Sequence, residues 1–333
     1  MTRLFTKVDP SIIDKSGGKW IRTSSDNRIV EYSVHGNLDN PNAPILITSY
    51  VAEYLLMGDR RTSQFAHGNF KVISVSIPGL GNSDFHPGHK ISEWPSTDLE
   101  PILKQEKIDG PFSVWGFCLG ALYAMSVAQY FGPARVASLG LRVPFLPLSL
   151  SQELGLPQGK PTLPTSKEVL QNTFPVKMCR FFMGIAISIM TSSSSLLCYL
   201  MKSGLFGSSF ASMARLRLDH PKESLYMQRL MENFGVEAML HAMAKDVVLD
   251  CPDVDPRKIK LKSNRIVVWY AKDDDDTPPS HGKWLAEECF PSCKIRAMET
   301  GYGHLGGGLL DMSTFYKQLE LAATAAAAAS AAD

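Results

Sequence analysis

The sequence lacks the cysteine patterns that assign many proteins to a class at once. Its 333 residues include only six cysteines, with no Cys-x-x-Cys pair and no Cys/His group at the spacing of zinc ligands. Six cysteines in a chain of this length are too few for a disulfide-stabilised scaffold. We therefore expect a reducing, cytoplasmic setting, and we predict no metal site.

An excess of charge of either sign is also missing. The chain has 34 Lys and Arg against 33 Asp and Glu, and no basic block, so nucleic acid is not the expected partner. The first 18 residues contain no apolar segment of the kind found in secretory signals. With 44% hydrophobic and 20% charged residues, the composition is that of a globular protein and excludes a disordered or fibrous chain.

A continuous apolar run long enough to cross a membrane is absent. The segment at 181–201 carries no charge, but Thr191 and four serines interrupt its middle. A membrane span needs about 20 nearly continuous apolar residues. The sequence favours two buried or half-buried helices joined by a serine-rich turn, and membrane association is the less favoured alternative.

What the chain does contain is short apolar runs, many of them β-branched, separated by helix-length gaps. Expected strands cover residues 20–23, 29–34, 44–49, 71–77, 112–117, 136–143, 265–271 and 294–298. Helical patterns cover residues 121–130, 279–289 and 313–323. This alternation predicts an α/β protein with a mainly parallel central sheet and flanking helices.

The alternation of strand and helix patterns stops in the middle of the chain. A segment rich in Pro, Gly and Ser, at 148–165, is predicted to be a linker, and helical patterns follow at 222–233 and 236–247. The predicted divisions are an α/β core at 1–147 and 256–320, an inserted helical unit at 148–255, and an alanine-rich tail at 321–333. We expect the tail to be a frayed helical extension without a function of its own.

The strongest local motif is Gly116-Phe-Cys118-Leu-Gly120, where a predicted strand ends and a helix begins. It matches the nucleophile-elbow pattern with cysteine in the nucleophile position. Such a turn is usually strained, and the glycines would remove side chains that collide with the neighbouring strand and helix. The following helix N-terminus favours a thiolate. The alternative is a buried cysteine that acts as a small hydrophobic residue.

Two polar segments follow later strands. His304 lies among glycines directly after the strand at 294–298, which suits a mobile general base better than a core residue. Four aspartates, Asp273 to Asp276, follow the strand at 265–271, and one of them is placed to orient the histidine. The alternative is a solvated acidic turn or a weak cation site. The order of nucleophile, acid and base favours a catalytic triad.

In these motifs and their order, the chain resembles the α/β-hydrolase superfamily. Residues 76–84 (SIPGLGNSD) resemble its D-x-P-G-x-G-x-S-D turn, with Ser76 in place of the first aspartate, and residues 29–36 resemble its second strand. The resemblance spans about 18–147 and 258–320. It implies an α/β-hydrolase fold in which the helical insertion is a cap, and hydrolysis of an ester, thioester or lactone.

The resemblance also implies roles for single residues. Cys118, Asp274 and His304 would form a triad like that of the dienelactone hydrolases, and Asp274 is preferred to Asp273 because it lies four residues before Pro278. Oxyanion donors would be the amides of Leu119 and of a residue near Tyr50 or Val51, where the family's usual His-Gly is missing. No cofactor is implied.

Two other functions stay open at this point. Polyhydroxyalkanoate synthases carry a cysteine in a similar motif, so an acyltransferase with the same triad is one alternative. A non-catalytic ligand-binding member of the superfamily is the other, favoured by the cysteine and by the missing His-Gly. The apolar residues at 181–190 predict a small-molecule acyl substrate that is apolar, if they line the site rather than pack on the core.

Overall fold

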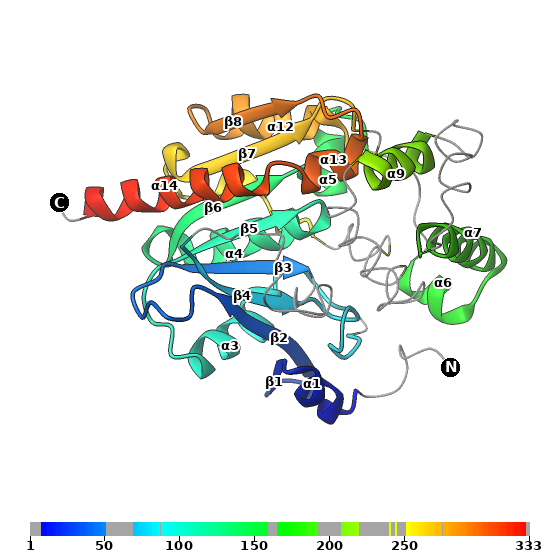
Figure 1. The fold of residues 1–333 in the computed structure, drawn as a ribbon, viewed down its shortest axis with the longest axis horizontal. Helices are drawn as coiled ribbons and strands as arrows, with labels where there is room; N and C mark the ends of the chain where they lie inside the picture. The colour runs from blue at the N-terminus through cyan, green and yellow to red at the C-terminus, as the bar shows by residue number, and fades with distance from the viewer. Residues whose placement is uncertain are drawn as a thin grey trace.

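The computed structural model describes residues 8–50, 69–86, 88–158, 165–191, 208–219, 240, 244, 251–274 and 276–330. Its centre is an eight-stranded sheet in the order β1-β2-β4-β3-β5-β6-β7-β8 (Figure 1). The strands are β1 (Lys19–Arg22), β2 (Ile29–Gly36), β3 (Ile45–Tyr50), β4 (Lys71–Ser76), β5 (Phe112–Phe117), β6 (Val136–Arg142), β7 (Ile266–Ala271) and β8 (Lys294–Met298). Pairing is antiparallel from β1 to β4 and parallel from β4 to β8, so the predicted mainly parallel sheet is confirmed.

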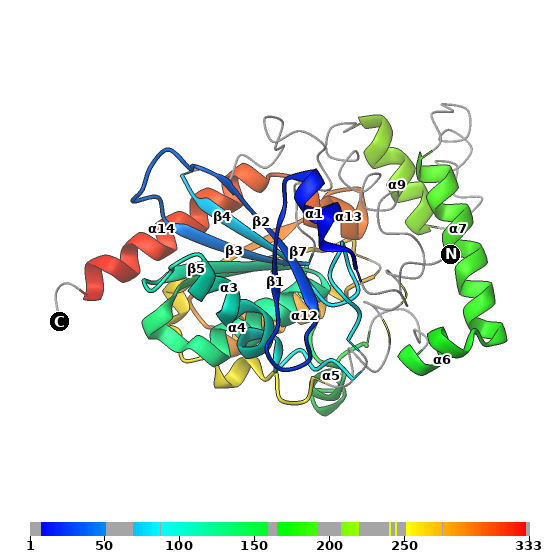
Figure 2. The ribbon, with the colours of Figure 1, turned by 90° about the horizontal axis from the view of Figure 1, so that it is seen from below.

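Helices cover both faces of the sheet. Helix α4 (Leu119–Arg135) and helix α14 (Met312–Ser330) lie on opposite faces (Figure 2). Alternate strand residues therefore join different clusters: Val268 packs on the α4 side and Trp269 on the α14 side. All six residues of β7 are buried, as expected for a parallel strand covered on both faces.

The other core helices are short. They are α1 (Pro10–Ser16), α3 (Glu100–Gln105), α5 (Leu148–Glu153), α12 (Pro279–Trp284) and α13 (Gly303–Leu309), with π-helical turns at Pro95–Leu99 and Leu285–Cys289. Single helical turns follow at Pro256–Lys258 and Ser263–Arg265. Helix α13, which carries His304, begins shortly after β8 and packs against β7.

The segment predicted to be a linker differs from that prediction. Residues 148–153 form α5, in which Leu150 is buried, and Leu148, Leu154 and Leu156 pack against the main core cluster. The linker prediction is wrong for this stretch, because its leucines supply enough apolar surface to bury a helical turn against the sheet domain.

The inserted unit contains only helices among the parts of 165–219 that the structure describes. They are α6 (Ser166–Gln171), α7 (Phe174–Thr191) and α9 (Ser208–Asp219). Helix α6 starts with a capping box between Thr165 and Glu168. The three helices lie on the side toward which β3 and β5 point (Figure 1). The predicted helices at 222–233 and 236–247 lie outside the described residues, and the boundaries of the cap remain a prediction.

The first half of the uncharged segment at 181–201 is the end of α7, and residues 192–201 are outside the described part. Phe181 and Phe182 on this helix are 65% and 56% exposed, so the prediction of a buried or half-buried helix is wrong for them. The face of α7 that is buried carries Val176, which packs with Val169 and Leu240. Among the described helices, none is long and apolar enough to cross a membrane.

Candidate active site

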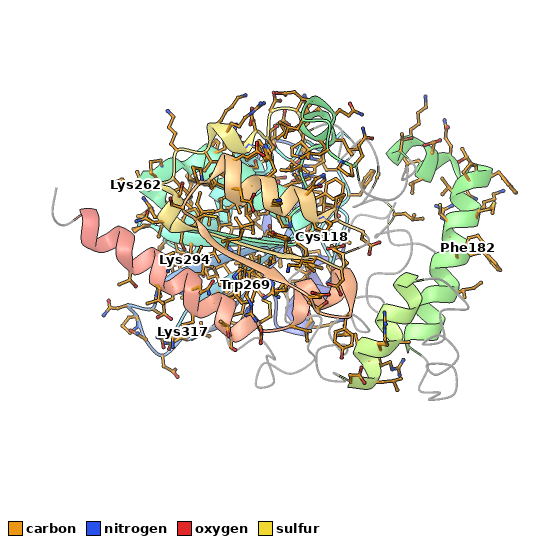
Figure 3. All side chains as sticks on the ribbon, turned by 90° about the horizontal axis from the view of Figure 1, so that it is seen from above. Cys118, Phe182, Lys262, Trp269, Lys294 and Lys317 are labelled. Atoms are coloured by element: carbon orange, nitrogen blue, oxygen red, sulfur yellow. The ribbon has the colours of Figure 1, made fainter. Side chains whose placement is uncertain are left out.

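Cys118 lies in the turn between β5 and α4, at the edge of the core that faces α7 (Figure 3). Its backbone has φ 53° and ψ −120°, a strained conformation for a residue with a side chain. The Cys118 N–H donates to the carbonyl of Arg142 on β6 at 3.0 Å. This bond and the neighbouring strand hold the cysteine, half-buried, at the carboxyl edge of the sheet.

Close backbone contacts explain the two glycines of this turn. A Cβ atom on Gly116 would overlap the carbonyl of Gly120, and a Cβ atom on Gly120 would lie 2.7 Å from the carbonyl oxygen of Ser49 on β3. The Ser49 hydroxyl also donates to the Gly120 carbonyl at 3.2 Å. Any larger residue at either position would push the turn away from the sheet.

His304 and Asp274 meet at the same edge. The His304 Nδ1 and Asp274 Oδ2 atoms are 2.8 Å apart, the contact that the spacing to Pro278 predicts. The other carboxylate oxygen, Oδ1, accepts the N–H groups of Asp276 and Thr277, both at 2.8 Å. Since the Asp274 side chain is only 1% exposed and both oxygens have partners, its orientation toward the ring is well defined.

The His304 ring also interacts with the cysteine. Cys118 acts on it electrostatically, and the ring lies 5.1 Å, centroid to centroid, from the Phe117 ring. Burial lowers the pKa of His304, but the charge of Cys118 and the hydrogen bond to Asp274 outweigh it and hold that pKa well above 6.5. The surroundings of His304 therefore favour the protonated form of its ring.

The other aspartates of the acidic run have different positions. Asp273 accepts hydrogen bonds from the backbone of Thr300 and Gly303, at 3.2 and 3.1 Å, rather than from the ring. The Asp276 side chain is exposed, and Asp275 is outside the described residues. Of the three aspartates that the structure describes here, Asp274 is the one in contact with His304.

No family model matches the chain, and no curated protein matches it. Many solved structures do. A thermophilic esterase from Thermogutta terrifontis matches with a TM-score of 0.54 and 15% identity, covering 91% of this chain and 97% of its own. An α/β-hydrolase fold protein from Nakamurella multipartita (TM-score 0.61, 13% identity) covers 92% and 99%. The enol-lactonase from Burkholderia xenovorans (0.56, 13%) covers 92% and 100%. This chain has the α/β-hydrolase fold. At these identities the match shows the fold alone, and it confirms the fold predicted from the motifs.

In an α/β-hydrolase fold, oxyanion donors come from two backbone positions beside the nucleophile. Leu119 is the first residue of α4, where helix N–H groups have no acceptor within the helix. Tyr50 ends β3, directly after Ser49, which contacts Gly120. Val51 is outside the described residues. Both oxyanion assignments therefore remain proposals, supported by the position of the two backbones.

A buried carboxylate compensates for the aspartate missing from the turn at 76–84. Glu31 on β2 accepts the Asn82 backbone and side-chain N–H groups, both at 2.7 Å, and the Ser76 hydroxyl at 3.1 Å. Glu31 is fully buried. A motif search along one segment misses it, because it comes from a different strand.

Two histidines outside the triad are also structural. His89 is buried, with Nε2 3.0 Å from the hydroxyl of Tyr123 on α4. His281 is buried, and its Nε2 lies 2.8 Å from the Pro157 carbonyl oxygen. Within the described ranges, no three His, Cys, Asp or Glu side chains gather as ligands for a metal ion.

Proposed function

We propose that the chain hydrolyses carboxylic esters, lactones or thioesters with Cys118 as the nucleophile. The observation that carries this proposal is that Asp274 contacts the His304 ring, while Cys118 acts on the same ring electrostatically. Base and orienting carboxylate within hydrogen-bond reach of a nucleophile are the arrangement that acyl transfer requires. The esterase and the enol-lactonase of the same fold favour ester and lactone substrates.

In the first half-reaction, the Cys118 thiolate attacks the acyl carbonyl and forms a C–S bond. The negative charge moves to the carbonyl oxygen, where the Leu119 amide and a backbone donor near Tyr50 would bind it. The intermediate then expels the alkoxide or thiolate leaving group, which takes the proton from the His304 imidazolium. The product is a thioester between the acyl group and Cys118.

In the second half-reaction, neutral His304 removes a proton from water as the water attacks the thioester carbonyl. The new intermediate expels the Cys118 thiolate and releases the carboxylic acid, and His304 is again an imidazolium. Asp274 accepts a hydrogen bond from the Nδ1–H group throughout, which directs Nε2 toward the reacting atoms and stabilises the positive ring.

We also propose that the substrate is a small molecule with an apolar acyl group. Helix α7 lies on the side of the molecule that Cys118 faces (Figure 3). Phe181 and Phe182 on this helix are exposed, with ring centroids 5.7 Å apart. If the helical insertion covers the site, such side chains would bind an alkyl chain. The specificity constant kcat/KM would then rise with chain length, because its activation free energy would fall by up to about 0.8 kcal/mol per methylene buried. A flat series from acetyl to decanoyl esters would contradict the apolar site.

The experiment that tests the activity compares p-nitrophenyl butyrate, butyryl thiocholine and γ-butyrolactone as substrates of the full chain and of Cys118→Ala. Cys289→Ala is the matched control, because burial raises the pKa of the Cys289 thiol to about 12 and leaves it a poor nucleophile. We expect Cys118→Ala to lose turnover and Cys289→Ala to keep it.

Covalent chemistry supplies an independent readout. Iodoacetamide should modify Cys118 first and abolish turnover in step, and mass spectrometry should detect a butyryl adduct on Cys118 during turnover. Full turnover in Cys118→Ala would refute the proposal. If Cys118 is unreactive and a ligand binds tightly and equally well to the full chain and to Cys118→Ala, the chain is instead a binding protein.

A further inference from the structure

Helix α13, which carries His304, has little intrinsic stability. It spans seven residues, Gly303–Leu309, and three of its interior residues are glycine. Isolated helices this short do not form in water, and each interior glycine costs about 1 kcal/mol relative to alanine. Close packing imposes the glycines: a Cβ atom on Gly307 would lie 2.6 Å from Val143, and one on Gly308 would overlap the Phe117 ring. The helix must therefore be held from outside.

Its N-terminal end is held by an aspartate. Asp273 accepts the Gly303 N–H at 3.1 Å, the Thr300 N–H at 3.2 Å and the Thr300 hydroxyl at 3.1 Å. Burial raises the pKa of Asp273, but these hydrogen bonds outweigh it and lower that pKa overall. A carboxylate at this end also interacts favourably with the helix dipole.

Its C-terminal end is held by an arginine. The Arg142 Nη2 atom donates to the carbonyls of Gly307 and Leu310 at 2.7 and 2.6 Å, and Nε donates to Gly307 at 3.2 Å. These carbonyls belong to the last turn, whose acceptors have no partner within the helix. A cation at this end again complements the dipole.

Burying the Arg142 guanidinium carries a large desolvation cost. Arg142 is fully buried at the end of β6, with its guanidinium 5.0 and 5.1 Å from the centroids of the Trp269 and Phe315 rings. Burial lowers the pKa of Arg142. Within the described part of the chain, its side-chain hydrogen bonds go to carbonyls and to the Met312 sulfur, not to a carboxylate, so its desolvation is offset mainly by holding α13. The Arg142 carbonyl also accepts the Cys118 N–H, so one residue connects nucleophile and base.

We infer that Asp273 and Arg142 are positioning residues that hold the two ends of α13, so that His304 stays within reach of Cys118 and Asp274 together. This inference rests on the proposed function, since it assigns a purpose to the position of His304. Both residues act through the helix backbone, on the Gly307 carbonyl and the Gly303 N–H.

Loosening either end should move His304 rather than unfold the chain. Displacement of a catalytic group by about 1 Å costs on the order of 100-fold in rate. The titratable groups that face the ring are Cys118 and Asp274, and neither is changed by substituting Asp273 or Arg142. Weaker contact with them would lower the pKa of His304, so the alkaline limb of the rate profile should move to lower pH.

The test uses Asp273→Asn and Arg142→Lys in the full chain, assayed with p-nitrophenyl butyrate. We expect kcat to fall about 10- to 100-fold with KM within about 2-fold, and the alkaline limb to move to lower pH. The matched control for Asp273 is Asp276→Asn, an exposed aspartate of the same loop. The control for Arg142 is Arg265→Lys, whose guanidinium donates to the Ala137 and Pro133 carbonyls at the opposite edge of the sheet. These controls should change thermal stability at most.

Two further variants keep the test decisive if Arg142→Lys folds poorly. Thr300→Val removes one donor to Asp273 and should change kcat and the pH profile in the same direction, to a smaller extent. Arg142→Met should be more impaired than Arg142→Lys, because lysine retains the charge and a donor.

The possible outcomes distinguish a failure of this inference from a failure of the proposed function. If Asp273→Asn and Arg142→Lys lower the melting temperature but leave kcat and the pH profile like those of their controls, the residues are merely structural and the inference is wrong. If Cys118→Ala or Asp274→Asn keeps full turnover, the proposed function itself is wrong. Loss of turnover in these two variants with unchanged Asp273→Asn and Arg142→Lys removes the inference alone.

Discussion

The turn that carries Cys118 and the helix that carries His304 meet at one edge of the sheet, but they are held in different ways. The turn has a strained φ at Cys118 and is held by backbone contacts. The Cys118 N–H donates to the Arg142 carbonyl, and Gly120 lies close to Ser49. Charged side chains hold the two ends of the helix. The turn should therefore be sensitive to added volume, and the helix to lost charge.

The largest effect is expected from the carboxylate on the helix side. Asp274→Asn keeps the shape but removes the charge that stabilises the His304 imidazolium, and kcat should fall by about 10⁴-fold. The measurement is steady-state hydrolysis of p-nitrophenyl butyrate, with Asp276→Asn as the control. A loss of kcat below about 10-fold would mean that the charge of Asp274 contributes little to catalysis.

On the turn side, the strongest expected effect comes from volume. Gly116→Ala would place a methyl group on the Gly120 carbonyl, and we expect more than about 4 kcal/mol of lost stability. Gly184→Ala on α7 is the matched control, since a Cβ atom there meets nothing within 4 Å. Chemical denaturation measures both. A well-folded Gly116→Ala protein would show that the turn can relax.

A graded version of the same test uses Gly120→Ala. The added Cβ atom would lie 2.7 Å from the Ser49 carbonyl oxygen, so the turn must move by a few tenths of an ångström, and stability should fall by about 1–3 kcal/mol. Turnover should fall as well, because Leu119 begins the same helix. Equal denaturation midpoints for Gly120→Ala and Gly184→Ala would contradict this expectation.

The smallest effect is a change in one titration. Cys118 and Asp274 raise the pKa of His304 above 6.5 against the opposing effect of burial. Cys118→Ala and Asp274→Asn should each lower it, and the double variant should bring it below the ordinary value, because burial then acts alone. Proton NMR of the His304 ring measures this directly. An unchanged titration in both single variants would show that the ring is not charge-coupled to them.

Local sequence was sufficient for much of the fold and part of the site. Strands β5 and β8 have the predicted bounds, because β-branched and aromatic runs between turn residues specify buried strands. The glycines around Cys118 and the four-residue spacing from Asp274 to Pro278 also carry their information within a few residues. Each of these features depends on neighbours along the chain, so its pattern can be read there.

The remaining features depend on residues that meet only after folding. Arg142 reaches Gly307, 165 residues later in the chain, and Glu31 supplies the carboxylate of a turn 51 residues away. Asp273 differs from Asp274 only in which way its side chain points from the end of β7, toward the helix backbone or toward the ring. The burial of His89 and the exposure of Phe181 likewise depend on which surfaces pack together. The amino-acid sequence specifies which residue type stands at each position. The energetic cost of a buried charge, and what that charge does, depend on the partners that tertiary packing brings to it.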